Sequence, residues 1–229
     1  MFRWKRERVP EGGAIDDDGG MSAERYGEIM LRRLGSEYRR FARYAAEAGT
    51  IAGRPPARLL EIGPGPGWVS VFVSEALPGA EIVAVDASAD MARACAANFA
   101  AAGIADRARV VVGTAELLGD SVEGPFDLIY TRDSLHHWID PVAGFRNARS
   151  LLAPGGVLAL GDERRDLSPA ARALVAIASR RMGPMGGYWR SSLAAAYTPA
   201  ELGAMLAEAG FEGASVRGGF LDVRIIARA

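Results

Sequence analysis

The stretch from Leu59 to Ser70 reads LLEIGPGPGWVS, and it is the most informative part of the chain. An apolar run is followed by glycines at every second position: Gly63, Gly65 and Gly67. Glycine has no Cβ atom, so it lets the backbone turn sharply and lets a ligand approach the main chain closely. The interleaved prolines stiffen the turn without adding bulk at the glycine positions. The stretch therefore predicts a strand, then a ligand-binding loop, then a helix.

Short apolar runs alternate with helical periodicity on both sides of this loop. Five such runs predict strands, at residues 57–63, 80–88, 109–116, 126–133 and 156–163. Strands that alternate with helices favour parallel pairing through right-handed crossovers. Residues 212–229 read instead as two consecutive strands, which is typical of an antiparallel edge. We therefore predict an α/β fold with a doubly wound, mostly parallel seven-stranded sheet and an antiparallel C-terminal edge strand.

The composition divides the chain into three parts. Residues 1–20 combine basic residues with EGG and DDDGG and are expected to form a mobile N-terminal arm. Residues 21–52 show helical periodicity and are expected to form a helical N-terminal cap. Residues 53–229 are expected to form the main domain, with a lid insertion at about 165–198. Within that insertion, Met182–Ser192 is rich in glycine and aromatic residues and is predicted to be a loop.

The totals exclude several classes of protein. The 229 residues carry a net charge of −1, so the chain has no general attraction to nucleic acid or to an anionic membrane. A single cysteine, Cys95, excludes an intrachain disulfide, and with only two histidines no metal site is expected. No secretion signal or membrane-spanning stretch is visible, so we expect a cytoplasmic protein that does not contact membranes. The oligomeric state stays open.

The spacing of the loop separates two ligand classes. The dinucleotide fingerprint is G-x-G-x-x-G, whereas here Trp68 stands where its third glycine belongs. Glu61 lies two residues before the loop, where a carboxylate would repel a pyrophosphate and attract a cationic amino group. A nicotinamide-dependent oxidoreductase is therefore disfavoured.

Five motifs in order resemble those of the class I, Rossmann-like S-adenosylmethionine-dependent methyltransferases. EIGPGPG resembles the first motif, and IVAVDAS, VVGTAELL, FDLIYTRDSLHHWIDP and LLAPGGVLAL resemble the four that follow. Together they extend over roughly residues 55–165. The resemblance implies S-adenosyl-L-methionine as cofactor and S-adenosyl-L-homocysteine as product.

The resemblance also implies a cofactor site in this chain. By this resemblance, Asp86 of this chain would accept hydrogen bonds from both ribose hydroxyls, and Ala115 and Glu116 would flank the adenine. The expected cofactor-binding residues are Glu61, Gly63, Gly65, Gly67, Asp86, Ala87, Met91, Thr114, Ala115, Glu116 and Arg132. Each has a plainer interpretation as well: Asp86 as a turn residue, Glu116 as a solvated charge at a helix start, and Met91 as core.

The candidate general base stands after the fourth strand, in TRDSLHHW. Histidine titrates near neutral pH and suits proton abstraction from a hydroxyl group. We assign the catalytic role to His137, because the resemblance places the second histidine of such a pair toward the methyl group. His136 is expected to be structural and to border the substrate. Asp133 could place the cofactor or substrate, or could be a turn residue.

The methyl acceptor is expected to be a small molecule, either natural-product or quinone-like, that is methylated by in-line displacement. Its site is predicted from aromatic and polar residues outside the common core: Tyr26, His136, Met185, Tyr188, Trp189 and Arg190. Two alternatives stay open. The acceptor could be a peptide or protein side chain, or the chain could be a scaffold that binds the cofactor without catalysis.

Overall fold

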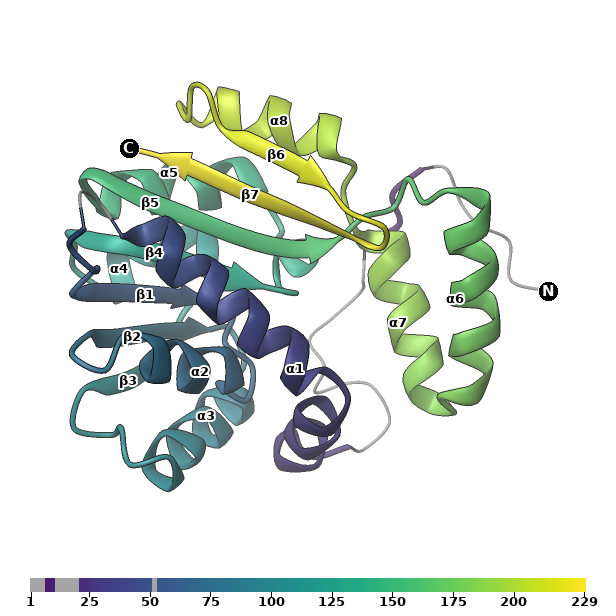
Figure 1. The fold of residues 1–229 in the computed structure, drawn as a ribbon, viewed down its shortest axis with the longest axis horizontal. Coiled ribbons are helices and arrows are strands. Elements are labelled where there is room, and N and C mark those ends of the chain that lie inside the picture. The colour runs from purple at the N-terminus through teal and green to yellow at the C-terminus, as the bar shows by residue number, and fades with distance from the viewer. Residues whose placement is uncertain (1–6, 11–20, 51–52) are drawn as a thin grey trace.

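A computed structural model of the chain describes residues 7–10, 21–50 and 53–229, and within these ranges its centre is a seven-stranded sheet of order β3-β2-β1-β4-β5-β7-β6 (Figure 1). The strands are β1 (Arg58–Ile62), β2 (Glu81–Asp86), β3 (Ala108–Val112), β4 (Phe126–Arg132), β5 (Leu152–Glu163), β6 (Ser215–Gly218) and β7 (Asp222–Arg228). Strands β1 to β5 pair in parallel, and β7 pairs antiparallel with both β5 and β6. The predicted fold class is confirmed: β7 supplies the antiparallel pairing, and β6 beside it closes the edge.

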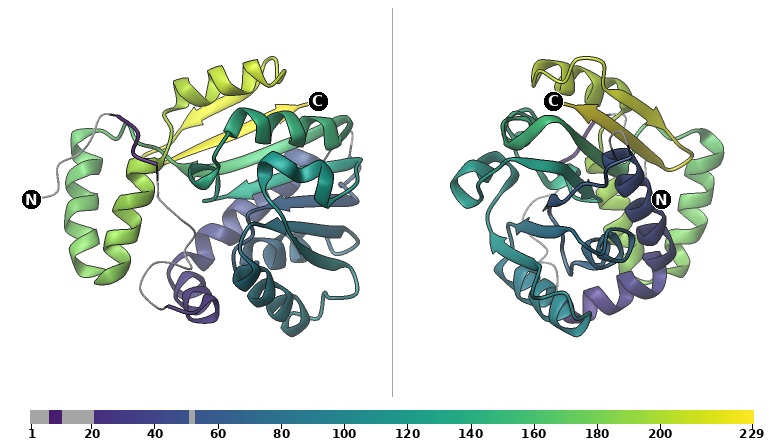
Figure 2. Two further views of the ribbon diagram at one scale, coloured as in Figure 1. Left: turned by 180° about the vertical axis from the view of Figure 1, so that it is seen from behind. Right: turned by 60° about the vertical axis from the view of Figure 1, so that its left-hand side comes forward.

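Helices cover both faces of the sheet. One face carries α1 (Ala23–Gly49), α2 (Trp68–Ala76) and α3 (Ala89–Ala101), and the other carries α4 (Leu118–Ser121), α5 (Pro141–Leu151) and α8 (Pro199–Glu208) (Figures 1 and 2). A further pair, α6 (Pro169–Arg181) and α7 (Pro184–Ala195), stands beyond the carboxyl ends of the parallel strands (Figure 1). Short 3-10 turns follow β3 and β4, at η2 (Ala115–Leu117) and η3 (Leu135–His137).

The core explains why the strands read as continuous apolar runs. Successive side chains of a strand point to opposite faces, and here both faces are covered. Leu59 is buried among residues of α1, α2 and α3, whereas Leu60 is buried in the cluster on the α5 and α8 side. Phe99 of α3 and Phe145 of α5 are almost fully buried on the two faces. Two cores therefore hold the carboxyl ends of the strands in place.

The helix starts follow their sequence signals. Ser88, Asp140 and Ser168 each accept a hydrogen bond from a backbone N–H in the first turn of α3, α5 and α6. Thr198 and Glu201 form a reciprocal capping box at α8.

The loop predicted at Met182–Ser192 is wrong, because most of this stretch forms helix α7. A Cβ atom at Gly186 would overlap the carbonyl oxygen of Ser179, so the glycine lets α7 lie directly against α6. Leu193 then packs with Val175 in a small apolar cluster between the two helices. Tertiary packing thus overrides the weak helix propensity of glycine.

The predicted N-terminal arm falls mostly on residues 1–6 and 11–20, which lie outside the described residues, as do residues 51–52 of the predicted cap. Residues 7–10 are bonded to the main domain. Val9 donates a backbone hydrogen bond to Ala194 O, and the Arg8 guanidinium donates to Ala195 O at 2.6 Å and to His136 O at 2.9 Å. This segment therefore links the end of α7 to the turn after β4. In the described part of the chain, we find no helix with the length and apolar character needed to cross a membrane.

Candidate active site

The glycine loop lies at the end of β1, where the strand order reverses between β1 and β4, and open α/β sheets bind ligands at such a point. Gly63, Gly65 and Gly67 have φ angles of 66°, 53° and 81°. A Cβ atom at Gly63 would overlap the Ser134 side chain, and one at Gly67 would lie 2.6 Å from Cys95 Sγ. The position at Gly65 faces open space. Packing therefore requires the outer two glycines, and the middle one leaves the main chain accessible.

Asp86 ends β2 beside this loop and is buried. Its Oδ2 atom accepts a hydrogen bond from Gly65 N at 2.8 Å, and its Oδ1 atom accepts one from Ser88 N at 2.9 Å. The carboxylate thus fixes the loop relative to the start of α3. It stands at the position where the resemblance expects contacts to ribose hydroxyls.

Glu61 lies beneath the loop rather than in it. The side chain is only 1% exposed, and its carboxyl group accepts a short hydrogen bond from the Ser70 hydroxyl, whose oxygen lies 2.7 Å from that of Tyr130. Burial raises the pKa of Glu61 to about 8, although the Ser70 hydrogen bond acts against it. Glu61 therefore joins β1, α2 and β4 internally, whereas the sequence led us to expect contact with a cationic group.

The raised pKa makes Glu61 a source of pH-dependent stability. Because its folded value of about 8 exceeds the ordinary 4.5, the folded chain binds this proton more tightly than the unfolded chain. The resulting stabilisation is complete below about pH 4.5 and is lost as the pH rises to about 8, by at most ~1.4 kcal/mol per pH unit. E61Q, which keeps an acceptor for Ser70, is expected to flatten this loss in urea unfolding measured from pH 5 to 9. Parallel stability curves for the two proteins would contradict it.

The remaining expected cofactor residues follow β2 and β3. Ala87 is exposed, Met91 is buried in a small cluster with Ala94 and Ala23, and Thr114 precedes the buried Ala115. The carboxylate of Glu116 accepts hydrogen bonds from the backbone N–H groups of Ile139 and Asp140 at 2.8 and 3.1 Å. Glu116 thereby connects the loop after β3 to the loop after β4.

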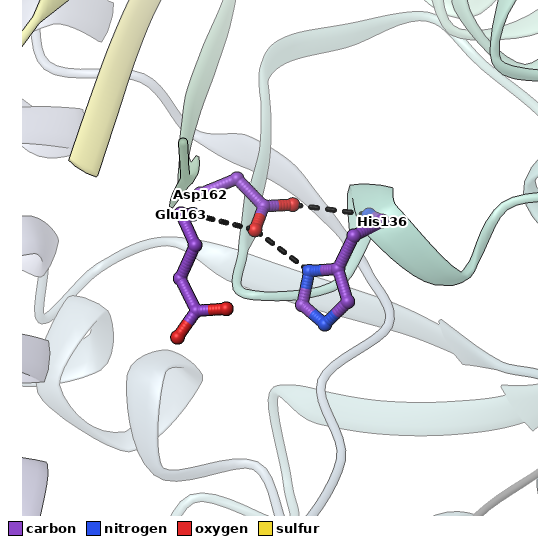
Figure 3. A group of neighbouring side chains, drawn as sticks. All are labelled: His136, Asp162 and Glu163. Atoms are coloured by element: carbon purple, nitrogen blue, oxygen red, sulfur yellow. Dashed lines mark hydrogen bonds and ion pairs between the residues drawn. The ribbon is translucent and has the colours of Figure 1, made fainter. Parts of the chain in front are cut away.

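His136 forms a buried pair with Asp162, which is the penultimate residue of β5 (Figure 3). The distance from His136 Nδ1 to Asp162 Oδ1 is 2.7 Å, and Asp162 Oδ2 accepts from His136 N at 3.1 Å. Although burial acts in the opposite direction, His136 and the backbone N–H of Glu163 hold the pKa of Asp162 below its usual value. An ionised carboxylate can only accept, so Nδ1 carries the imidazole proton and Nε2 is the basic nitrogen.

His137 lies differently from its neighbour. Its side chain is exposed and its ring centroid is 4.1 Å from that of His136. The sequence assigned the base to His137 and a structural role to His136, whereas the carboxylate partner belongs to His136. Asp162 was missed, although a signal existed: it stands at the carboxyl end of a predicted parallel strand, as Asp86 does.

Both histidines line a cavity of about 690 Å³ bordered by α1, α6, α7, the turn after β4 and the tip of the β6–β7 hairpin. Five of the predicted substrate residues line it: Tyr26, His136, Met185, Tyr188 and Trp189. Arg190 is absent from the lining, and its guanidinium donates to Ser179 Oγ at 2.9 Å. Neighbouring positions of a helix point about 100° apart, which separates Arg190 from Trp189.

The floor of the cavity carries charge and strain. Arg132 is nearly buried there, and its Nε atom lies 3.2 Å from Asp133 Oδ1. Asp133 has a φ of 54°, a left-handed conformation that is costly for a residue with a side chain and that occurs often at functional sites. Burial raises the pKa of Asp133 to about 6, with Arg132 opposing it. Arg132, which the sequence analysis expects at the cofactor, borders this cavity.

Three potential metal ligands meet at this wall of the cavity. His136, Asp162 and Glu163 each offer an atom within 4.8 Å of the other two. The two oxygens of Asp162 already accept three hydrogen bonds, from His136 Nδ1, His136 N and Glu163 N. A cation would have to compete with these donors, so the arrangement favours a histidine held by a carboxylate.

Comparison with known proteins agrees with this geometry. A family described as "Methyltransferase domain" matches residues 26–216, so the chain belongs to that family and the predicted family is confirmed. The ubiquinone biosynthesis O-methyltransferase of Xanthomonas euvesicatoria pv. vesicatoria (strain 85-10) is 33% identical over 165 residues, which cover 71% of this chain and 65% of that protein. The match thus spans slightly less than two thirds of that relative.

Solved structures share the fold. The plantazolicin methyltransferase BamL, in complex with a triazolic desmethylPZN analog and SAH, superposes with a TM-score of 0.72 at 14% identity, covering 89% of this chain and 88% of that one. The mitomycin 7-O-methyltransferase MmcR superposes with a TM-score of 0.63 at 21% identity, covering 92% and 62%. At these identities the likeness shows the fold.

Proposed function

We propose that this protein transfers the methyl group of S-adenosylmethionine to a hydroxyl oxygen of a small apolar molecule, natural-product or quinone-like. The observation that carries the proposal is the buried His136–Asp162 pair in the wall of the 690 Å³ cavity, at the same edge of the sheet as the glycine loop. The names of the ubiquinone and mitomycin O-methyltransferases support oxygen as the methylated atom.

The residues at the ends of β1, β2 and β3 fit the cofactor. The accessible main chain at Gly65, the carboxylate of Asp86 and the apolar surface near Ala115 suit an amino-acid part, a ribose and an adenine respectively. SAH bound to BamL supports the same assignment. When bound, S-adenosylmethionine supplies a methyl group already activated by its sulfonium leaving group.

The residues of this chain then have three tasks. His136 Nε2 takes the proton of the acceptor hydroxyl, and Asp162 stabilises the resulting imidazolium. The largely apolar walls of the cavity, including Met185 and Trp189, exclude water from the reacting atoms. Holding the hydroxyl oxygen in line with the methyl group supplies most of the remaining rate enhancement.

Calorimetric titration with S-adenosylmethionine, S-adenosylhomocysteine and NADH tests the cofactor first. We expect both sulfur compounds to bind and NADH not to bind; binding of NADH alone would overturn the proposal. A panel of phenols, hydroxyquinones and short peptides with S-adenosylmethionine, read by mass spectrometry, then tests the acceptor. Methylated peptides alone would favour the peptide alternative, and binding without any methyl transfer would favour a scaffold.

Asp86 is expected to contribute strongly to cofactor binding. D86A should raise the Kd for S-adenosylhomocysteine about 100-fold or more, because it removes two hydrogen bonds to a charged acceptor at ~1.5–3 kcal/mol each. D90A is the matched control, since Asp90 is an exposed carboxylate on α3 that pairs with Arg93. Thermal melting must accompany the titration, because Asp86 also binds Gly65 N and Ser88 N. A folded D86A protein with unchanged affinity would refute this role.

A further inference from the structure

Glu163 is the last residue of β5, and it lines the acceptor cavity beside His136. Its Oε2 atom is buried and has no hydrogen-bond partner among residues 7–10, 21–50 and 53–229. Leaving a buried polar atom unpaired costs about 1–3 kcal/mol, so such an atom in a cavity wall points to a ligand. The methyl-transfer chemistry assigned to His136 and Asp162 does not use this carboxyl group.

The position of Glu163 relative to the base is specific. Three atoms lie within 4.8 Å of one another: a carboxyl oxygen of Glu163, a carboxylate oxygen of Asp162 and a ring nitrogen of His136. Figure 3 shows the Asp162 carboxylate turned toward Nδ1 of His136, while the Glu163 side chain extends past it alongside the ring. An acceptor oxygen held by His136 would therefore have Glu163 next to it.

The chemistry of this carboxyl group favours a role as hydrogen-bond donor. Burial raises the pKa of Glu163 to about 8, although the neighbouring His136 acts in the opposite direction. At neutral pH the group is therefore mostly protonated, and a protonated carboxyl has one O–H to donate. Oxygens that accept such a bond without being methylated are carbonyl and ether oxygens.

We propose that Glu163 donates a hydrogen bond to a carbonyl oxygen adjacent to the hydroxyl group that His136 deprotonates. The site then selects acceptors that carry a hydroxyl and a carbonyl on neighbouring positions, such as peri-hydroxyquinones and ortho-hydroxy aryl ketones. The inference rests on the proposed function. In such acceptors the hydroxyl proton is bonded internally to the carbonyl, and donation from Glu163 releases it. The oxygen–methyl bond then forms as the sulfur–methyl bond breaks, the hydroxyl proton passes to His136, and Glu163 keeps its own proton.

Two isomeric acceptors test the proposal. In 1-hydroxyanthraquinone the hydroxyl lies beside a carbonyl, and in 2-hydroxyanthraquinone it does not. The measured quantity is the ratio of kcat/KM for the two isomers, compared between wild type and variants so that their intrinsic reactivities cancel. E163L should shift the ratio about 10-fold or more toward the 2-isomer, whereas E163Q, whose amide still donates, should stay within about 3-fold of wild type. E212L, at an exposed glutamate before β6, is the matched control and should leave the ratio unchanged.

Binding of each isomer to the protein saturated with S-adenosylhomocysteine gives a second readout that needs no turnover. E163A replaces E163L if the leucine variant does not fold. Equal ratios in wild type and E163L, or wild-type binding without preference for the 1-isomer, overturn the role of Glu163 and leave the proposed function intact. A preference that disappears with EDTA and returns with Mg²⁺ also overturns it, because Glu163 would then hold a cation. Failure of S-adenosylhomocysteine to bind wild type refutes the proposed function itself, and the inference with it.

Discussion

H136A is expected to lower kcat by about 10²–10⁴-fold while the affinity for S-adenosylhomocysteine changes by less than about threefold. The reason is the geometry of the buried pair: Asp162 fixes the proton on Nδ1, which leaves Nε2 to accept the proton of the acceptor hydroxyl. The measurement is steady-state kinetics on an acceptor found in the panel, alongside calorimetry with the product. D162N should also lower kcat, because a neutral amide does not stabilise the positively charged imidazolium as a carboxylate does.

H137A separates the two assignments of the base. The adjacent imidazole borders the same cavity but is exposed, so its removal is expected to cost less than about 10-fold in kcat. A larger loss in H137A than in H136A would return the catalytic role to His137, as the sequence first indicated. H136Q, which retains a donor for Asp162, distinguishes the loss of the base from the cost of leaving a buried carboxylate unpaired.

G67A is expected to destabilise the protein by roughly 2–4 kcal/mol and to abolish measurable cofactor binding. Part of the cost is the φ of 81°, which alanine adopts at about 1 kcal/mol, and the rest is overpacking. The new methyl would lie 2.6 Å from Cys95 Sγ and 3.0 Å from a ring carbon of Phe99, both buried in the core. Urea unfolding and calorimetry measure the two effects.

G79A is the matched control, because a Cβ atom there meets nothing within 4 Å. It should change the free energy of unfolding by less than about 0.5 kcal/mol. The double variant G67A/C95A removes the sulfur that the new methyl would strike, so it should recover part of the lost stability relative to additive expectation. Additivity of the two substitutions would show that backbone strain, and not contact with Cys95, causes the destabilisation.

Local signals explain why much of the fold could be predicted from the sequence. The N-caps at Ser88 and Asp140 and the turn at Gly63–Gly67 depend on side chains and φ angles within a few residues. Helix α7 could not be predicted in this way. Its glycines argue against a helix locally, and only the backbone of α6, on which Gly186 packs, makes them favourable.

The same distinction between local and long-range signals applies to the residues of the site. Asp86 and the glycine loop could be placed because both end parallel strands. The choice between His136 and His137 could not be made, because adjacent residues differ only in the direction that the short turn η3 gives them. The roles proposed for Asp162 and Glu163 depend on their closeness to His136 in that turn, which Asp162 contacts across 26 residues of sequence, and this closeness has no periodic signature.

The walls of the proposed acceptor cavity include elements from both ends of the chain. Helix α1 contributes Tyr26 and Met30, the β6–β7 hairpin contributes Phe220 and Leu221, and the proposed cofactor site is built from the segments between them. The hairpin tip can therefore vary without disturbing the loop after β1, whereas α1 is tied to that loop, because Gly27 packs against Pro66 and its carbonyl oxygen accepts a hydrogen bond from Trp68 Nε1. Such a chain is expected to acquire new substrates through changes at the hairpin, while α1 and the middle of the chain keep one cofactor, so relatives can share a reaction and differ in what they modify.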